Sequence, residues 1–464
     1  MTAVDEIAPS STASDLDALA AWASDFSLAD LPGELLPTLR GCVLYGLAVG
    51  MATLRVPPAQ MICRTLDLDG PPAGSSVRLL DGVASSASNA ALANGVLLSG
   101  RVQGDSHACG HIGGVVIPTA LAVAQHGNLS GAEMLASLVA GYETGLRIGR
   151  DHSKALSERG FRTTPVYGVF AAAAVAARGL GLDAATTRNA LSVSANLAGG
   201  LREYVTAGTD ESPFQAGFAA RAGVSAAQLV STGLNAAGSA LHGPAGFYSA
   251  YGGAASDHGT RLAVDLGRQF EFPEVTYKPH PACVFLRGMI HGVAALRAQA
   301  GEGAVLEELE VRLCPFEAEF LGIRYAGPFS AASQTTMSAP FCAALTWATG
   351  TVGYATLREF DNPAVLELVP KVRIVADPNL GQYETHLRLE LADGRTLRDV
   401  SGPGDGDYKV RWDEVVPVAW ALCAEVGVPA ELIEAFIEAV GRVDTARDVS
   451  EVVGAVRDMV RAAS

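Results

Sequence analysis

A series of long apolar segments, rich in alanine and poor in charge, constrains most strongly what this chain can fold into. These segments lie at 114–125, 131–147, 164–178 and 185–197. Alanine has the highest helix propensity, and its small side chain lets neighbouring helices approach closely. Because several of the segments are apolar on nearly every face, we expect them to form helices inside a bundle.

The net charge and the segment lengths argue against two classes of partner. The chain has 49 Asp and Glu against 33 Lys and Arg, which gives a formal net charge of −16. An acidic surface repels the phosphates of nucleic acids and anionic lipids, so we expect neither as a partner. The most apolar segments, such as 166–177, are shorter than the roughly 20 residues that cross a bilayer. We therefore interpret them as buried core helices.

Cysteine usage and the N-terminus indicate a reducing compartment. The seven cysteines are scattered and no CxxC pair occurs, so the sequence contains no disulfide framework. The N-terminal stretch MTAVDEIAPSSTASD is acidic and polar, and it lacks the basic region and apolar run of a signal peptide. We therefore expect a cytoplasmic protein.

The hydrophobic pattern divides the chain into three parts. Residues 1–271 indicate helices, residues 272–405 mix helical and strand patterns, and the helical pattern returns over 406–464. Alternating segments that predict half-buried strands lie at 306–313, 371–377 and 383–397. The last of these contains Asp393-Gly394, a hairpin turn signal. We predict a mainly α protein in which both chain ends build a large all-helical domain and a smaller α+β domain is inserted.

A glycine cluster at 401–407 is the only stretch that resembles a nucleotide-binding loop. It follows a predicted strand, but two Asp within it would repel a pyrophosphate and no helix begins directly after it. We interpret it as a loop that crosses between the domains. The sequence contains no Walker motif, no G-x-S-x-G and no H-E-x-x-H.

The most polar constellation is GDSHACGH at 104–111, which lies between two apolar helices. Three interpretations are open. Asp105, His107, Cys109 and His111 together would make a metal site, although zinc sites usually combine a short ligand pair with distant ligands. Asp105 or Ser106 would cap a helix while the histidines are merely solvated. In the third interpretation His111, with a pKa near neutrality, carries out acid–base chemistry.

A second constellation, YKPHPAC, lies at 277–283, with Arg287 and His291 following it. Two prolines fix the backbone and favour an extended entry into a helix, which places Lys278 in a defined position. The alternative is an ordinary surface lysine beside a buried structural cysteine, Cys283.

These residues and their order along nearly the whole chain resemble the MmgE/PrpD family. The resemblance rests on AALANG (90–95), HIGGVVIPTALAVAQ (111–125), SGAEMLASLVAGYETGLRIG (130–149), RGFRTTPVYGVFAAAAVAARGLGLD (159–183), ALSVSANLAGGL (190–201), GPAGF (243–247), KPHPAC (278–283) and SAPFCAAL (338–345). It implies a helical domain with an α+β lid, an active site between the two, no cofactor, no metal and usually a homodimer. The family includes 2-methylcitrate dehydratase, cis-aconitate decarboxylase and iminodisuccinate epimerase.

Several positions depart from the family's motifs. Where the family commonly has D-x-D-D-T, this chain has VQGDS at 102–106, so only Asp105 and the hydroxyl of Ser106 remain. Arg162 replaces the histidine of the G-F-H-x-T block. In the T-K-x-x-H-x-G block, Ser212 replaces the lysine and Gln215 replaces the histidine.

The remaining motif positions are partly kept. His111 is retained, as are Lys278 and Cys283 of the K-x-x-P-x-C-x-x-x-H block, but Arg287 replaces its final histidine. The tyrosine that the family has in the lid matches Tyr325 most simply, with Phe320 as the alternative.

The resemblance implies a division of labour among these residues. Lys278, Arg162 and Arg287 would bind carboxylates, since guanidinium groups bind them in a bidentate way. His111 would move protons with Asp105 orienting it, and Tyr325 and Ser106 would donate hydrogen bonds. The remaining predicted substrate-binding residues are His107, Ser212 and Cys283.

Three functions fit this altered site and a small-molecule substrate. The first, which we favour, is a divergent lyase, isomerase or cyclase that acts in a specialised biosynthetic pathway. The second is an orthodox organic-acid dehydratase, decarboxylase or epimerase that uses other side chains. The third is a catalytically silent binding protein. All enzymatic interpretations require His111 and Lys278 to share one cavity.

Overall fold

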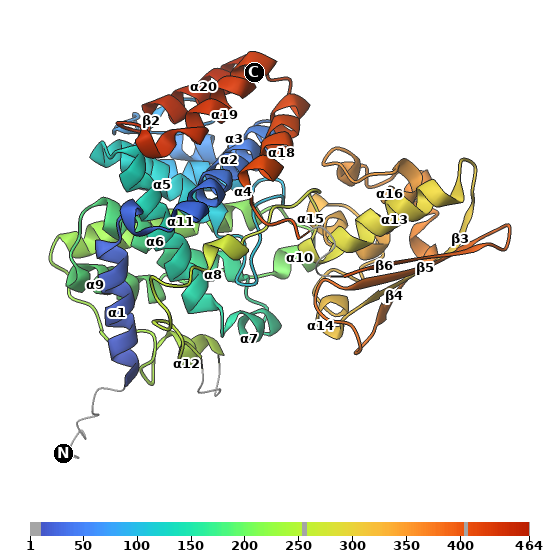
Figure 1. Ribbon diagram of the computed structural model, residues 1–464, viewed down its shortest axis with the longest axis horizontal. Coiled ribbons are helices and arrows are strands. Elements are labelled where there is room, and N and C mark those ends of the chain that lie inside the picture. Colours follow the sequence, from blue (N-terminus) through green and yellow to red (C-terminus); the bar gives the residue numbers. More distant parts are fainter. Residues whose placement is uncertain (1–10, 253–257, 403–406, 464) are drawn as a thin grey trace.

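Two large hydrophobic cores organise the protein in the computed structural model, which describes residues 11–252, 258–402 and 407–463. The larger core takes its buried side chains from residues 16–275 and 410–463, so both ends of the chain contribute to it. The second core is built mainly from residues 282–391. Figure 1 shows the corresponding helical body and the smaller part that contains the sheet. The predicted domain boundary at 405/406 lies outside the described residues.

The described residues confirm a mainly α fold. The helices of the body are α1 (Ser11–Asp25), α2 (Leu36–Ala52), α3 (Pro57–Asp67), α4 (Ala87–Ser99), α5 (Gly113–Gly127), α6 (Gly131–Gly149), α7 (Ser153–Glu158), α8 (Thr163–Gly179), α9 (Ala184–Ala195), α10 (Glu203–Ala207), α11 (Ser212–Ser231), α12 (Phe247–Gly252), α18 (Trp412–Glu425), α19 (Ala430–Gly441) and α20 (Ser450–Ala463). Short 3₁₀ helices are η1 (Leu28–Asp30), η2 (Gly33–Leu35), η3 (Phe272–Glu274) and η7 (Val443–Thr445).

Helix α8 lies at the centre of the body and packs against α5, α6, α9 and α11. Small residues permit this close packing. At Gly223 of α11, an added Cβ would lie 2.4–2.7 Å from atoms of α8. The alanine-rich segments predicted as buried helices are therefore the helices of the core.

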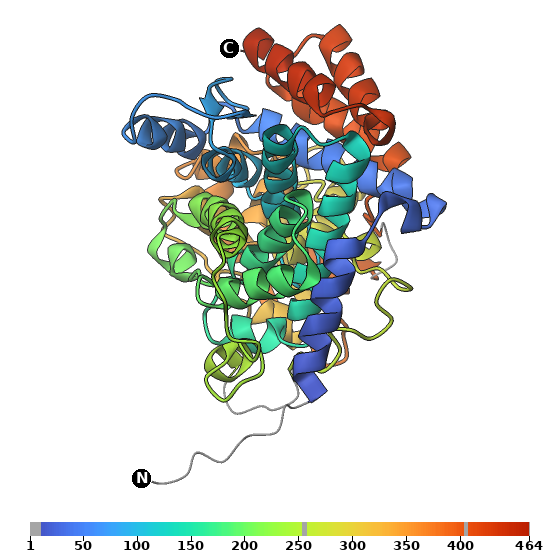
Figure 2. The same ribbon diagram turned by 90° about the vertical axis from the view of Figure 1, so that its left-hand side faces the viewer.

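The C-terminal helices return to the N-terminal part of the body. Helix α18 packs against α2, and α19 and α20 pack against each other and against α2 (Figure 2). By length and composition alone, one stretch of the described residues, Gly33–Ala52, could cross a membrane. It is longer than the apolar segments expected from the sequence. Because 72% of its apolar window is buried inside the protein, it has the environment of a core helix.

A four-stranded sheet forms the framework of the second part. Its strands are β3 (Leu306–Leu313), β4 (Val372–Ala376), β5 (Thr385–Leu391) and β6 (Thr396–Ser401), in the order β4-β3-β5-β6. Strand β3 pairs in parallel with β4 and antiparallel with β5, and β5 pairs antiparallel with β6. The predicted turn at Asp393-Gly394 joins β5 to β6, and Gly394 has a positive φ of +88°. A two-stranded ladder, β1 (Ser76–Val77) with β2 (Ala84–Ser85), lies in the body.

Helices cover this sheet and connect it to the body. They are α13 (Arg287–Ala300), α14 (Pro315–Ala318), α15 (Ala332–Thr335), α16 (Ala339–Thr349) and α17 (Pro363–Leu366), with the 3₁₀ helices η4 (Val284–Leu286), η5 (Thr356–Arg358) and η6 (Val369–Lys371). Helix α13 packs against β5 and β6, and α16 packs against α13. Helix α10 contacts α15, so the two parts meet there, as Figure 1 shows.

Candidate active site

The two polar constellations of the sequence lie side by side. Ser106 and Thr276 form an antiparallel bridge in which each main-chain N–H donates to the other's carbonyl at 2.8 Å. This bridge ties the loop between α4 and α5 to the segment that enters the second part. A cavity of about 380 Å³ lies at this junction, and both His111 and Lys278 line it. The shared cavity that the enzymatic interpretations require is therefore present.

His111 is held as a neutral base. Its main-chain N–H donates to the hydroxyl of Thr164 at 3.0 Å, and its Nδ1 lies 2.6 Å from the carbonyl oxygen of Asp105. Because a carbonyl only accepts hydrogen bonds, Nδ1 carries the proton and Nε2 has a free lone pair. Burial lowers the pKa of His111 well below its usual value, and Lys278 and Arg162 lower it further.

Asp105 stabilises the loop through its carboxylate, and it orients His111 through its main-chain carbonyl. The carboxylate oxygens accept from the N–H of Gly113, each at 3.0 Å, and from the hydroxyl of Tyr142 at 2.9 Å. Only 5% of Asp105 is exposed, and burial raises the pKa of its carboxyl to about 6. The predicted orienting role thus belongs to its main-chain carbonyl, while the carboxylate fixes the start of α5 and does not line the cavity.

Lys278 is a buried cation. Only 3% of it is exposed, and its Nζ donates to the carbonyl of Val102 at 3.0 Å. Its main-chain N–H donates to the hydroxyl of Tyr45 at 3.0 Å. Burial is the main cause that lowers the pKa of Lys278 from 10.5 to about 8; Arg162 contributes to the fall, and Cys283 and Asp105 oppose it. The alternative of an ordinary surface lysine is therefore wrong.

Arg162 and Arg202 are two of the three arginines that line the same cavity. Arg162 donates to the carbonyl of Ser212 and, at 3.3 Å, to the side-chain oxygen of Gln215. Arg202 is 7% exposed, and its guanidinium lies 3.7 Å from the ring centroid of Phe320. Its buried Nη2 has no hydrogen-bond partner among the described residues. Arg202 was not predicted from the sequence, although it directly follows the ALSVSANLAGGL block.

The charged side chains that line the described cavity are all basic. They are Arg150, Lys154, Arg162, Arg202 and Lys278. No Asp or Glu is among the lining residues, although the chain as a whole has a net charge of −16. A cleft of one sign between low-dielectric walls concentrates ligands of the opposite charge. The cavity therefore suits an anionic ligand.

The remaining predicted site residues divide into two groups. Ser106, His107, Ser212 and Cys283 line the cavity. Arg287 and Tyr325 do not, which corrects two of the predicted positions. The guanidinium of Arg287 lies 4.5 Å from the ring centroid of Tyr383, and the hydroxyl of Tyr325 donates to the carbonyl of Pro328. The alternative lid position, Phe320, does line the cavity.

The described residues contain no group of three or more side chains able to hold a metal ion. In the loop at 104–111, the carboxylate of Asp105 is bound to Gly113 and Tyr142, and the thiol of Cys109 donates to the carbonyl of Leu146 at 3.3 Å. Two of the four candidate metal ligands, Asp105 and Cys109, are thus engaged in hydrogen bonds within the protein.

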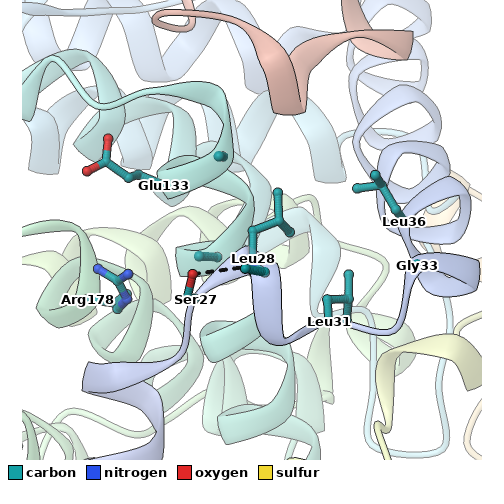
Figure 3. A pocket seen from close by; sticks show the side chains of 10 residues that line it. Ser27, Leu28, Leu31, Gly33, Leu36, Glu133 and Arg178 are labelled. Atoms are coloured by element: carbon teal, nitrogen blue, oxygen red, sulfur yellow. Dashed lines mark hydrogen bonds between the residues drawn. The ribbon is translucent and has the colours of Figure 1, made fainter.

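A second hollow lies in the helical body, between the η1–η2 segment and helices α6 and α8 (Figure 3). Its volume is about 460 Å³, and its lining is mostly apolar. Its charged groups, Glu133 and Arg178, serve the local structure: Glu133 caps α6 through Ser130, and Arg178 donates to the carbonyl of Phe26 at 2.9 Å. The cavity at His111 combines a histidine with five cationic side chains and is therefore the candidate active site.

Comparison with known proteins identifies the family. The sequence pattern of the MmgE/PrpD N-terminal domain matches residues 17–258, more than half of the chain. The chain belongs to the MmgE/PrpD family. A cis-aconitate decarboxylase-like protein of Aspergillus oryzae is 24% identical over 465 residues, which cover 94% of this chain and 95% of that protein. A cis-aconitate decarboxylase of Aspergillus terreus is 28% identical over 227 residues, 46% of this chain and 45% of the relative.

These findings confirm the resemblance inferred from the sequence blocks. MmgE/PrpD relatives with these names are enzymes, and a decarboxylase is a lyase, so the family supports an enzymatic function for this chain. The identities of 24% and 28% leave room for a different substrate in this member.

Proposed function

We propose that this MmgE/PrpD-family protein is a divergent, cofactor-independent lyase or isomerase that moves protons on a small organic acid. The observation that carries the proposal is the pairing of a neutral imidazole, His111, with a cavity whose charged lining residues are all cationic. A neutral imidazole is a base at physiological pH. Cations stabilise the negative charge that develops when carbon next to a carboxylate loses a proton.

Each group has a defined role in this mechanism. The substrate carboxylate binds to Arg162, Arg202 and Lys278, which lowers the energy of the enediolate-like charge formed beside it. Nε2 of His111 accepts the proton from carbon, and its carbonyl partner stabilises the imidazolium that forms. The ammonium of Lys278 donates a proton to the leaving group in an elimination, or to carbon in an isomerisation.

The names of the relatives favour a second candidate, the decarboxylation of cis-aconitate. In that reaction the electron pair of the broken C–C bond passes to carbon, which must then be protonated. Lys278, whose pKa is about 8, is mostly protonated at neutral pH and would act as this acid.

Proton exchange with solvent tests the proposal whatever net reaction the enzyme performs. The purified protein is incubated in D₂O with cis-aconitate, 2-methylcitrate, iminodisuccinate and a panel of substituted dicarboxylic acids, and proton NMR follows deuterium at carbon next to the carboxylates. His111→Gln should lower exchange or turnover at least roughly 100-fold. His126→Gln is the matched control, because this exposed histidine lies at the other end of α5.

The outcomes separate the candidates. Exchange or turnover of a substituted acid that His111→Gln abolishes supports the divergent enzyme. Efficient release of CO₂ from cis-aconitate replaces that assignment with the second candidate. A folded protein that exchanges no proton on any acid of the panel contradicts both.

A further inference from the structure

An aromatic wall lines one side of the active-site cavity. It consists of Phe285 in η4, Phe316 in α14, Phe320 two residues after α14, and Tyr383 two residues before β5. The ring centroid of Phe285 lies 4.8 Å from that of Phe320, 5.8 Å from that of Phe316 and 5.9 Å from that of Tyr383. All four side chains are half-buried, so part of each ring remains accessible. The wall therefore presents apolar surface toward the cavity.

The surrounding structure holds this wall in place. Tyr383 has a left-handed φ of +66°, which a bulky residue rarely adopts. Its main-chain N–H donates to Oε1 of buried Glu317 at 2.8 Å, and the guanidinium of Arg287 stacks 4.5 Å from its ring centroid. A strained backbone conformation of this kind persists only where the surrounding contacts hold it in place, and such conformations are frequent at ligand-binding sites. This gives Arg287 a positioning role behind the wall.

The cationic groups and the aromatic wall meet at Arg202. Its guanidinium lies against the face of Phe320 at 3.7 Å, and its buried Nη2 lacks a protein partner among the described residues. Lys278 and Arg162 line the same cavity as Arg202. The positive charges of these three side chains attract anionic ligands. A ligand that fills the cavity thus meets cations and rings together.

We propose that the substrate is an acid with a hydrocarbon tail: its carboxylates bind to Arg162, Arg202 and Lys278, and an aryl or alkyl group lies against the aromatic wall. The inference rests on the proposed function and adds the substrate class. A tail-less polycarboxylate would leave the rings uncovered, and a carboxylate set against them would face the negative side of their π-systems. A tail covers the same rings and removes apolar surface from water.

Calorimetric titration of the wild-type protein with a matched series tests this directly. The probes are succinate, benzylsuccinate, hexylsuccinate and benzyl alcohol. Benzylsuccinate or hexylsuccinate should bind at least about tenfold more tightly than succinate. Benzyl alcohol, which has the ring without carboxylates, should bind more weakly than either tailed acid.

Two variants locate the effect. Phe285→Ala should reduce the preference for the tailed acids to threefold or less, whereas Phe218→Ala, an aromatic residue 55% exposed on α11, should leave it unchanged. Phe320→Leu provides a milder second change in the wall, and it should reduce the preference for benzylsuccinate over succinate.

The result separates this inference from the proposed function. If succinate binds as tightly as benzylsuccinate and hexylsuccinate, the inference is overturned, whether or not the enzyme exchanges protons. If the tailed acids bind preferentially and Phe285→Ala removes the preference, the aromatic wall binds the tail; a failure of deuterium exchange would then overturn the proposed function and leave the ligand preference of the cavity standing.

Discussion

Lys278 is the residue at which function and stability oppose each other most directly. It is 3% exposed, and burial lowers its pKa from 10.5 to about 8. A fall of this size corresponds to about 3 kcal/mol by which the folded state disfavours the ammonium form, relative to the unfolded chain. The protein thus retains a destabilising buried cation at the cavity.

We predict that Lys278→Met stabilises the protein at pH 7 while it impairs activity. Methionine has a similar length and no charge, so the replacement removes the penalty of about 3 kcal/mol. It also removes the hydrogen bond to Val102, which costs about 1 kcal/mol. The net expectation is a gain of about 2 kcal/mol in the free energy of unfolding. Turnover should fall roughly 10²–10⁴-fold, because the proton donor is lost.

Urea unfolding between pH 7 and pH 10.5 measures this effect. Between about pH 8 and pH 10.5 the unfolded wild-type chain keeps the Lys278 proton and the folded chain does not, so wild-type stability rises with pH relative to the variant. The advantage of the variant is therefore full below pH 8 and falls to zero at about pH 9.5. Near pH 10.5 the variant should be less stable than the wild type by about 1 kcal/mol, the contribution of the lost hydrogen bond to Val102. Lys154→Met, at an exposed lysine of the same cavity, should change stability by less than about 0.5 kcal/mol. A Lys278→Met variant that is destabilised at pH 7, or a difference independent of pH, refutes the reasoning.

Three further predictions follow from the geometry. The pH profile of kcat/KM should fall on the alkaline side near pH 8, where Lys278 loses its proton, and an acidic step near pH 6 should come from Asp105, whose pKa burial raises to about 6, and not from His111, whose pKa burial holds well below its usual value; an acidic step near pH 6.5 that persists in Asp105→Asn would contradict the neutral base. Gly223→Val should lower the free energy of unfolding by about 1–3 kcal/mol in urea titrations, because its Cβ would lie within 2.7 Å of α8, while Gly454→Val, in open space on α20, should cost less. Arg202→Gln should raise KM for an anionic substrate roughly tenfold in steady-state assays; an unchanged KM would remove Arg202 from substrate binding.

Local patterns in the sequence predicted the core helices and the sheet. The LEELEVRL segment is β3 without change of bounds, because its alternation reports a half-buried strand directly. The predicted core helix at 185–197 is α9, which begins one residue earlier, after the N-cap Asp183, and ends two residues earlier. The amphipathic helices α3 and α20 lie within the ranges predicted as helical, but they were not delimited individually, because they bury only one face and lack a continuous apolar segment.

The site was predictable where a short motif carries it. His111 and Lys278 each lie in a dense polar segment, and both line the cavity. The aromatic wall was not predictable, because Phe285 and Tyr383 are almost a hundred positions apart and meet only through the fold of the second core. The family resemblance implied a substrate-binding role for Arg287, but Arg287 begins α13 and its side chain stacks on Tyr383.

The protonation state of His111 is the most direct test of the central claim. Nitrogen NMR of histidine-labelled protein at pH 7, with the His111 signal assigned by its loss in His111→Gln, reports which ring nitrogen carries the proton. We predict a neutral ring with the proton on Nδ1, bound to the carbonyl of Asp105, and an unprotonated Nε2. An imidazolium at pH 7, or a neutral ring protonated on Nε2, would contradict the claim.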